Sequence, residues 1–267
     1  MTADAIPAAI VPSRPAWRSL LWTVPFTVLW TWLIYSLPVL PESGLPALAV
    51  RLMVHGLIAL GLWLGLERTD LTPGQRRTTW LAIMVPFTLW AAVAWTAAIN
   101  GVFRTSASPL PLLPLAIFLP LIIGAPLLLL SKRVGQLLDA MPTTWLVALQ
   151  LYRVFGSQWL AYWLRGLLPG LFAVPAAIAL ATGTAEGRKA AILWNIFGFA
   201  DLAVAITLGM IISPGPFQLI VQNGPSIGLD GYPNVLTPAF VVPGSILLHA
   251  LSLRQLRRRS RAEVARV

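Results

Sequence analysis

The chain alternates long apolar blocks with short polar connections along most of its length. Each block holds about 20 mostly apolar residues, the length that an α-helix needs to cross the hydrocarbon core of a membrane. The pattern predicts an all-α fold, an integral membrane bundle of eight transmembrane helices. The predicted spans are residues 17–38, 45–66, 78–99, 109–130, 144–164, 166–183, 190–212 and 235–256.

The connections between these spans carry the basic residues very unevenly. With eight spans, fifteen of the nineteen Lys and Arg residues fall on the side that holds both chain ends, and only Arg104 and Arg165 fall on the other. An excess of Lys and Arg marks the cytoplasmic side of a membrane protein. We therefore expect the N- and C-termini to be cytoplasmic.

The same pattern divides the chain into three parts. It predicts a cytoplasmic segment over 1–16, a single transmembrane domain over 17–256 and a basic cytoplasmic tail over 257–267. The tail follows the last span directly, where each basic residue gains about 1 kcal/mol from an anionic lipid surface. We expect the tail to contact anionic headgroups, although a plain stop-transfer anchor would also explain its charges.

Composition supports a membrane protein and narrows its partners. Hydrophobic residues make up 57% of the chain and charged residues 10%, with a mean hydropathy of +0.78, whereas soluble domains carry about 25% charged residues. The net charge of +10 does not indicate nucleic-acid binding, because the basic residues gather at the ends of apolar blocks. The chain has no cysteine, which excludes disulfides and thiolate chemistry.

Charged residues inside the predicted spans are few and mark the candidate site. Asp201 is the one carboxylate within a span, and Arg51 and Arg153 are the two arginines away from span ends. A charge at mid-membrane costs about 2.5–3.5 kcal/mol on insertion scales, so it usually has a partner. We expect an Asp201–Arg153 pair, matched in depth, with Arg51 or His55 as a second contact.

Two interpretations of these polar groups remain open. One is a structural network that fixes helix packing, and the other is a polar cavity that holds a substrate or an ion. The candidate site residues for the second interpretation are Asp201, Arg153, Arg51, His55, Asn195 and Gln150. A stripe of small residues around Asp201 predicts that this face meets a neighbouring helix closely.

The two histidines, His55 and His249, lie on spans that are predicted to run in the same direction. A haem held between them is therefore a weaker alternative. No metal-binding motif accompanies them. The chain also lacks phosphate-binding and nucleophile motifs, so an enzymatic activity is the less favoured expectation.

Four segments of the C-terminal half carry a family resemblance. They are "LQLYRVFGSQWL" (149–160), "LPGLFAVPA" (168–176), "WNIFGFADLAVAITLG" (194–209) and "LTPAFVVPGSILLHALSLRQL" (236–256). Together they resemble a family of small bacterial multi-pass membrane proteins with no assigned activity. The resemblance implies a bacterial cytoplasmic membrane, and it marks Arg153, Asn195, Asp201 and His249 as positions of the pattern.

This sequence departs from the family's pattern after the "FAVPA" segment. There the family continues with glycines and an aspartate, whereas this chain has Ala177, Ala179 and Leu180. A site built from two carboxylates is therefore not expected here. The resemblance supplies no reaction.

Two classes of function lead. The first is transport of a small solute or ion through a polar intramembrane site, and the second is a non-catalytic accessory or assembly subunit of a larger membrane complex. A haem- or pigment-binding protein or a lipid-modifying membrane protein comes third. The expected partners are the lipid bilayer and either another membrane protein or a second copy of the chain.

Overall fold

The computed structural model describes residues 17–37, 44–104, 112–142, 145–146, 149–150, 152, 161–162, 164–165, 188–212, 217–221 and 230–265. All regular elements among these residues are helical. They are α1 (Trp17–Ser36), α3 (Leu45–Glu67), α4 (Pro73–Ile99), α5 (Leu112–Leu130), α6 (Lys132–Ala140), α10 (Arg188–Ile212), the π-helix η4 (Thr237–Val241) and α11 (Val242–Val264).

Five helical stretches are long and apolar enough to cross a membrane. They are Leu45–Glu67, Pro73–Ile99, Leu112–Leu130, Ala191–Ile212 and Thr237–Ala262. Their length and apolar surface fit a membrane-embedded helical protein. The predicted spans at 144–164 and 166–183 lie almost wholly outside the described residues, so the count of eight stays a prediction.

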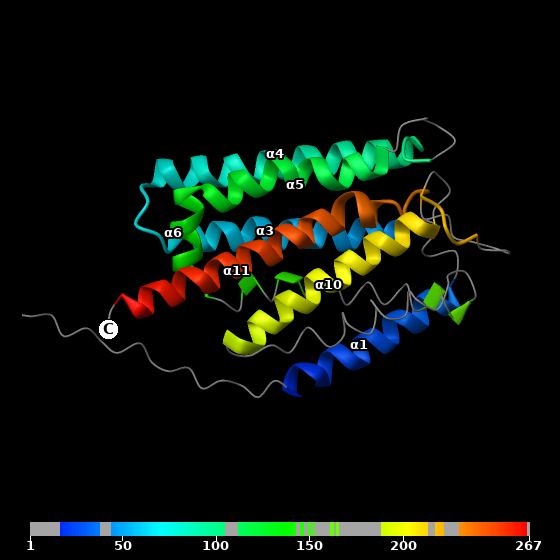
Figure 1. The fold of residues 1–267 in the computed structure, drawn as a ribbon, viewed down its shortest axis with the longest axis horizontal. Coiled ribbons are helices and arrows are strands. Elements are labelled where there is room, and N and C mark those ends of the chain that lie inside the picture. The colour runs from blue at the N-terminus through cyan, green and yellow to red at the C-terminus, as the bar shows by residue number, and fades with distance from the viewer. Residues whose placement is uncertain are drawn as a thin grey trace, which may run out of the picture.

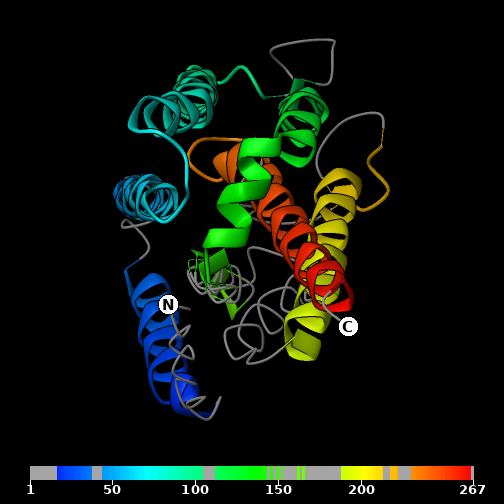
Figure 2. The ribbon, with the colours of Figure 1, turned by 90° about the vertical axis from the view of Figure 1, so that its left-hand side faces the viewer.

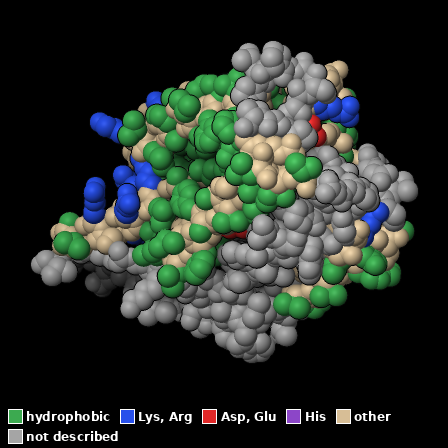
Figure 3. All heavy atoms as spheres, turned by 45° about the vertical axis from the view of Figure 1, so that its right-hand side comes forward, with side chains coloured by type: hydrophobic (Ala, Val, Ile, Leu, Met, Phe, Trp, Pro, Cys, Tyr) green, Lys and Arg blue, Asp and Glu red, His purple; other side chains and the backbone are tan. Residues whose placement is uncertain are grey.

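Helix α11 lies at the centre of the described helices (Figures 1 and 2). It packs against α5, α10 and α6, whereas α4 packs against α3 and η4. Exposed apolar side chains follow α1, α3, α4 and α5 along much of their length, as expected for lipid-facing helices. Figure 3 shows apolar side chains spread over one face of the molecule. The centre of the structure is therefore the surroundings of α11, and α1 and α3 to α5 carry much of the apolar outer surface.

Helix α6 crosses the end of the long helices and was not predicted from the sequence (Figure 1). Its buried residues Val134, Leu137 and Leu138 have the i, i+3, i+4 spacing of an amphipathic helix, and the Ser131 hydroxyl caps its first turn. Its buried face lies close to α3 at Gly65, where an added Cβ would come within 2.7 Å of the Leu137 side chain. Glycine at 65 therefore permits this close approach.

The last predicted span begins with a π-turn. In η4 the Val242 N–H bonds to the Thr237 carbonyl, five residues back, and Pro243 has no N–H to continue the helical ladder. The Ser245 hydroxyl donates to the Val241 carbonyl at 2.8 Å, which satisfies one carbonyl near the transition. Such π-turns often occur at functional sites.

Polar side chains of α11 bond to backbone carbonyls at the C-terminal ends of two other helices. Arg254 donates to the Leu128 carbonyl at 2.8 Å and to the Ser131 carbonyl at 2.9 Å, where α5 ends. Gln255 donates to the carbonyls of Leu138 and Met141, at 2.6 and 2.7 Å, where α6 ends. The last carbonyls of a helix have no partner within it, and cations are favoured there.

Two further arginines strengthen this junction. Arg259 donates to the Met141 carbonyl at 2.6 Å, and Arg258 forms a two-pronged ion pair with Asp139 of α6. The predicted boundary at 257 does not coincide with a break in structure, since α11 continues to Val264. Part of the basic tail thus holds the helix ends together.

Replacing Gln255 by Leu should destabilise the protein. The side chain is fully buried, and its loss would leave two carbonyls without this donor, a penalty of about 1–3 kcal/mol. Thermal unfolding in detergent would measure the change. Gln136→Leu on the exposed face of α6 is the matched control, and an equal effect of the two substitutions would contradict the capping role.

Candidate polar site between α10 and α11

One face of α11 presents a row of buried polar side chains. Ser245, His249, Ser252 and Gln255 follow one another at intervals of four, three and three residues, and each is at most 2% exposed. The spacing places them on one side of the helix. At 1.5 Å per residue the row extends over about 15 Å, half of the hydrocarbon core.

Asn195 of α10 joins two members of this row. Its amide nitrogen donates to the Ala191 carbonyl at 2.6 Å and to the Ser252 hydroxyl at 3.0 Å. Its amide oxygen lies 3.0 Å from Nδ1 of His249. Because the Ala191 carbonyl can only accept, the amide orientation is fixed, and His249 Nδ1 must carry the proton that it donates to Asn195.

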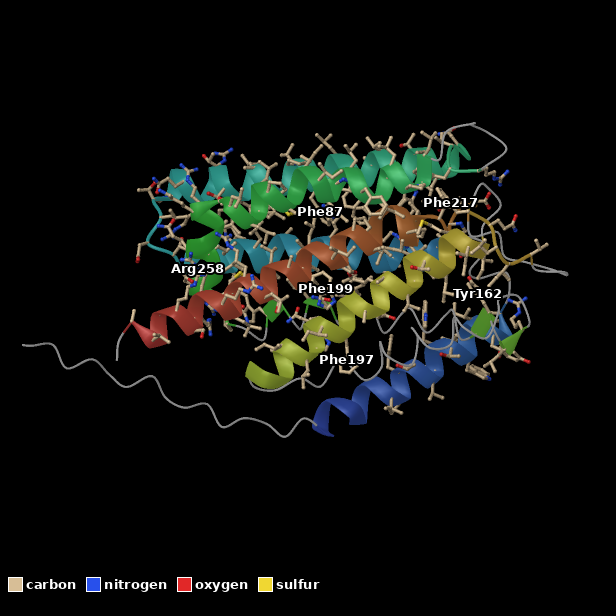
Figure 4. The ribbon with its side chains drawn as sticks, in the orientation of Figure 1. Phe87, Tyr162, Phe197, Phe199, Phe217 and Arg258 are labelled. Carbon is tan, nitrogen blue, oxygen red and sulfur yellow. The ribbon has the colours of Figure 1, made fainter. Side chains whose placement is uncertain are left out.

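The His249 ring is held in a tight cradle on α10. It packs against the rings of Trp194 and Phe199, with centroid distances of 4.4 and 5.3 Å (Figure 4 labels Phe199). A Cβ added at Gly198 would lie 2.1 Å from His249 Cε1 and 2.2 Å from Nε2. Only glycine at 198 leaves room for the ring in this position.

Asp201 lies on the same buried face of α10, and its side chain is 5% exposed. The pairs Asn195–Ser252 and Gly198–His249 set the antiparallel register of the two helices. One turn further along, this register places Asp201 at the depth of Ser245, whose hydroxyl bonds to the Tyr152 hydroxyl at 2.5 Å. Asp201 is thus level with Tyr152.

The predicted partner of Asp201, Arg153, lies outside the described residues. The proposed Asp201–Arg153 pair therefore stays a prediction, although Arg153 directly follows Tyr152 in the chain. Gln150, another predicted site residue, is 2% exposed. Neither oxygen nor nitrogen of its side-chain amide forms a hydrogen bond in the structure as described.

The contacts of Arg51 and His55 run to α3 and α4. Arg51 Nη1 donates to the Ala47 carbonyl at 3.0 Å, and its guanidinium lies 5.8 Å from the centre of the Trp95 ring. His55 Nε2 lies 2.9 Å from the Thr88 hydroxyl. The His55 ring also stacks on Phe87 at 4.7 Å. These two residues thus form a second polar group, between α3 and α4.

The model of a domain of unknown function, DUF8737, matches residues 110–257, which is more than half of the chain. The chain belongs to the DUF8737 family. No curated protein matches it, and no solved structure does.

The DUF8737 match includes one of the two polar groups and excludes the other. It includes α5, α6, α10 and α11 up to residue 257, and so the whole row on α11 with Asn195 and Asp201. Arg51 and His55 precede it. The match confirms the expectation that the C-terminal half belongs to an uncharacterised family, whereas the bacterial origin that the resemblance implies stays a prediction.

The structure gives His55 and His249 different surroundings. His55 contacts Thr88 and Phe87 of α4, and His249 contacts Asn195, Trp194 and Phe199 of α10. A haem between them stays an untested alternative. An absorption spectrum of the purified protein tests it, since a haem band that disappears in His249→Ala would be required. Among the described residues, no three His, Asp or Glu side chains gather into a metal site.

Three members of these polar groups, Gln255, Tyr152 and Thr88, were not predicted from the sequence. Tyr152 was not singled out, although it lies between the candidates Gln150 and Arg153. Thr88 was not singled out either, because nothing in its own span marks it as a partner of His55. A threonine or tyrosine within an apolar span is too common to indicate a specific contact.

Replacing Gly198 by Ala should destabilise the α10–α11 interface by about 1–3 kcal/mol, because the new methyl group overlaps the His249 ring. Thermal unfolding in detergent would measure this. Gly209→Ala on the same helix is the control, since no atom of the described residues lies within 4 Å of its added Cβ. Equal stability of the two variants would show that His249 is not held in this cradle.

Proposed function

We propose that the chain moves a small solute or an ion across the membrane through the polar layer between α10 and α11. The observation that supports the proposal is the buried row of Ser245, His249, Ser252 and Gln255, in register with Asn195 and Asp201. Polar and ionisable groups are costly to bury in a membrane, and there they commonly mark ion paths and proton relays.

The proposal includes a multi-pass topology in a bacterial cytoplasmic membrane, with eight spans and both termini in the cytoplasm. The distribution of charge supports this orientation. Exposed Lys132 and Arg133 of α6 lie at the same end as exposed Arg257 and Arg261 of α11. This basic end is the one expected to face the cytoplasm.

The basic end also supports contact with anionic headgroups. Arg254, Arg258 and Arg259 bond to α5 and α6, whereas Arg257 and Arg261 are exposed. Arg257 and Arg261 are therefore the arginines of α11 that we expect to contact anionic headgroups.

One observation favours the second candidate function, an accessory or assembly subunit. Asn195 bonds both His249 and Ser252, and the Gln255 amide nitrogen bonds two backbone carbonyls, so most of these polar groups have partners inside the protein, whereas Gln255 Oε1 has none among the described residues. A closed network of this kind fixes helix packing without carrying anything. The two functions therefore differ in whether the layer opens around Asp201.

Flux measurements on reconstituted vesicles separate the two. We expect the purified protein to accelerate at least one of two processes: collapse of a pH gradient reported by entrapped pyranine, or entry of acetate, urea or glycerol reported by light scattering. Asp201→Asn should slow the accelerated flux about tenfold, equivalent to about 1.4 kcal/mol in barrier height.

The matched control is Asp70→Asn, which removes an exposed carboxylate at the turn between α3 and α4. It should leave the flux unchanged. Correctly assembled wild-type protein that accelerates none of the probes would refute transport of these probes and favour an accessory subunit. Equal loss in both variants would show that Asp201 has no special role.

A further inference from the structure

Within the predicted spans, away from their ends, the arginines outnumber the carboxylates by one. The spans hold Arg51 and Arg153 away from their ends, but only one carboxylate, Asp201. Whichever arginine Asp201 accompanies, the other has no acidic residue of a span to balance it. An isolated charge in the hydrocarbon region is costly, so an anion from outside the chain would be bound favourably there.

Arg51 has the surroundings of such an anion site. It lies six residues after the start of α3, about 9 Å along the helix, near the end opposite α6. The Ala47 carbonyl is a neutral acceptor for Nη1, and the buried Nε forms no hydrogen bond in the structure as described. A guanidinium has five N–H donors in a planar fork that fits a carboxylate or a phosphate, so Arg51 retains donors for a ligand.

Other groups near Arg51 suit a small polar ligand. The Trp95 ring lies beside the guanidinium, and the hydroxyls of Tyr232 and Tyr152 are close enough to interact with it electrostatically. Tyr152 connects this region to Ser245 and so to the layer on α11.

We propose that Arg51 binds a small anion with carboxylate or phosphate oxygens, and that Trp95 lines the same site. If the protein transports a solute, as proposed above, this site would make that solute a small anion. The identity of the solute therefore rests on the proposed function. Binding itself does not depend on transport. The anionic oxygens can belong to a free solute or to a lipid headgroup, and the two sources give different results below.

Tryptophan fluorescence of the purified protein in detergent tests the proposal, with Trp95→Phe identifying the contribution of the nearby ring. Sodium acetate, sodium phosphate and phosphatidylglycerol are titrated separately, at constant ionic strength, with phosphatidylcholine as the neutral lipid. We expect a saturable change with acetate or phosphate. Arg51→Gln should weaken it at least about tenfold, as expected for a lost charge-assisted contact.

The matched control is Arg104→Gln, which removes an exposed arginine just after α4 and should leave binding unchanged. Arg51→Lys keeps the charge but loses the planar fork, so it should bind with intermediate affinity, and it keeps the test decisive if Arg51→Gln fails to fold. A response to phosphatidylglycerol alone would assign the site to a lipid headgroup and overturn the proposal that a free solute binds there.

No saturable response in the wild type, or an equal response in Arg51→Gln, would overturn the anion site altogether. These outcomes are distinct from failure of the transport proposal. Anion binding without flux would leave the site standing and remove transport. Proton or urea flux without anion binding would support transport and overturn the anion site.

Discussion

The structure depends on the cost of leaving a polar group unsatisfied in hydrocarbon. Water cannot complete hydrogen bonds there, so each backbone carbonyl and polar side chain needs a partner within the protein. Helix α11 supplies many of these partners. It brings Arg254 and Gln255 to the ends of α5 and α6 and His249 and Ser252 to Asn195, and it packs against both groups of helices. Helix α11 therefore needs its polar face because it lies at the centre, where the groups of the surrounding helices need hydrogen-bond partners.

The same constraint explains why α11 begins and ends as it does. At one end, Pro243 removes a backbone donor, and the π-turn with the Ser245 hydroxyl accommodates the change. At the other end, arginines that an orientation signal alone would leave in solvent instead cap helix C-termini, where the helix dipoles favour positive charge. The basic pattern from which the cytoplasmic side is predicted thus also builds the junction of three helices.

The sequence predicted those parts of the fold that depend on long apolar runs. The bounds of α3, α10 and the described part of α5 agree closely with their predicted spans, because hydrophobic length alone determines them. Helix α4 begins five residues early, at Pro73, because Thr72 and Gln75 form a capping box ahead of the apolar block. Helix α6 was missed because it is short and amphipathic, and its Ser131 cap was the available signal.

Within the candidate site, the sequence identified residues but not their partners. Asn195 and His249 were both singled out, yet their hydrogen bond depends on the register of two helices, which periodicity within each span does not determine. Gly198 sets that register by admitting the ring, and the same register brings Asp201 to the depth of Tyr152 and Ser245. Asn195 is bonded to α11 within the protein, whereas the buried Gln150 amide forms no hydrogen bond among the described residues. The register of α10 and α11, and not the periodicity within either span, therefore decides which of the predicted polar residues meet.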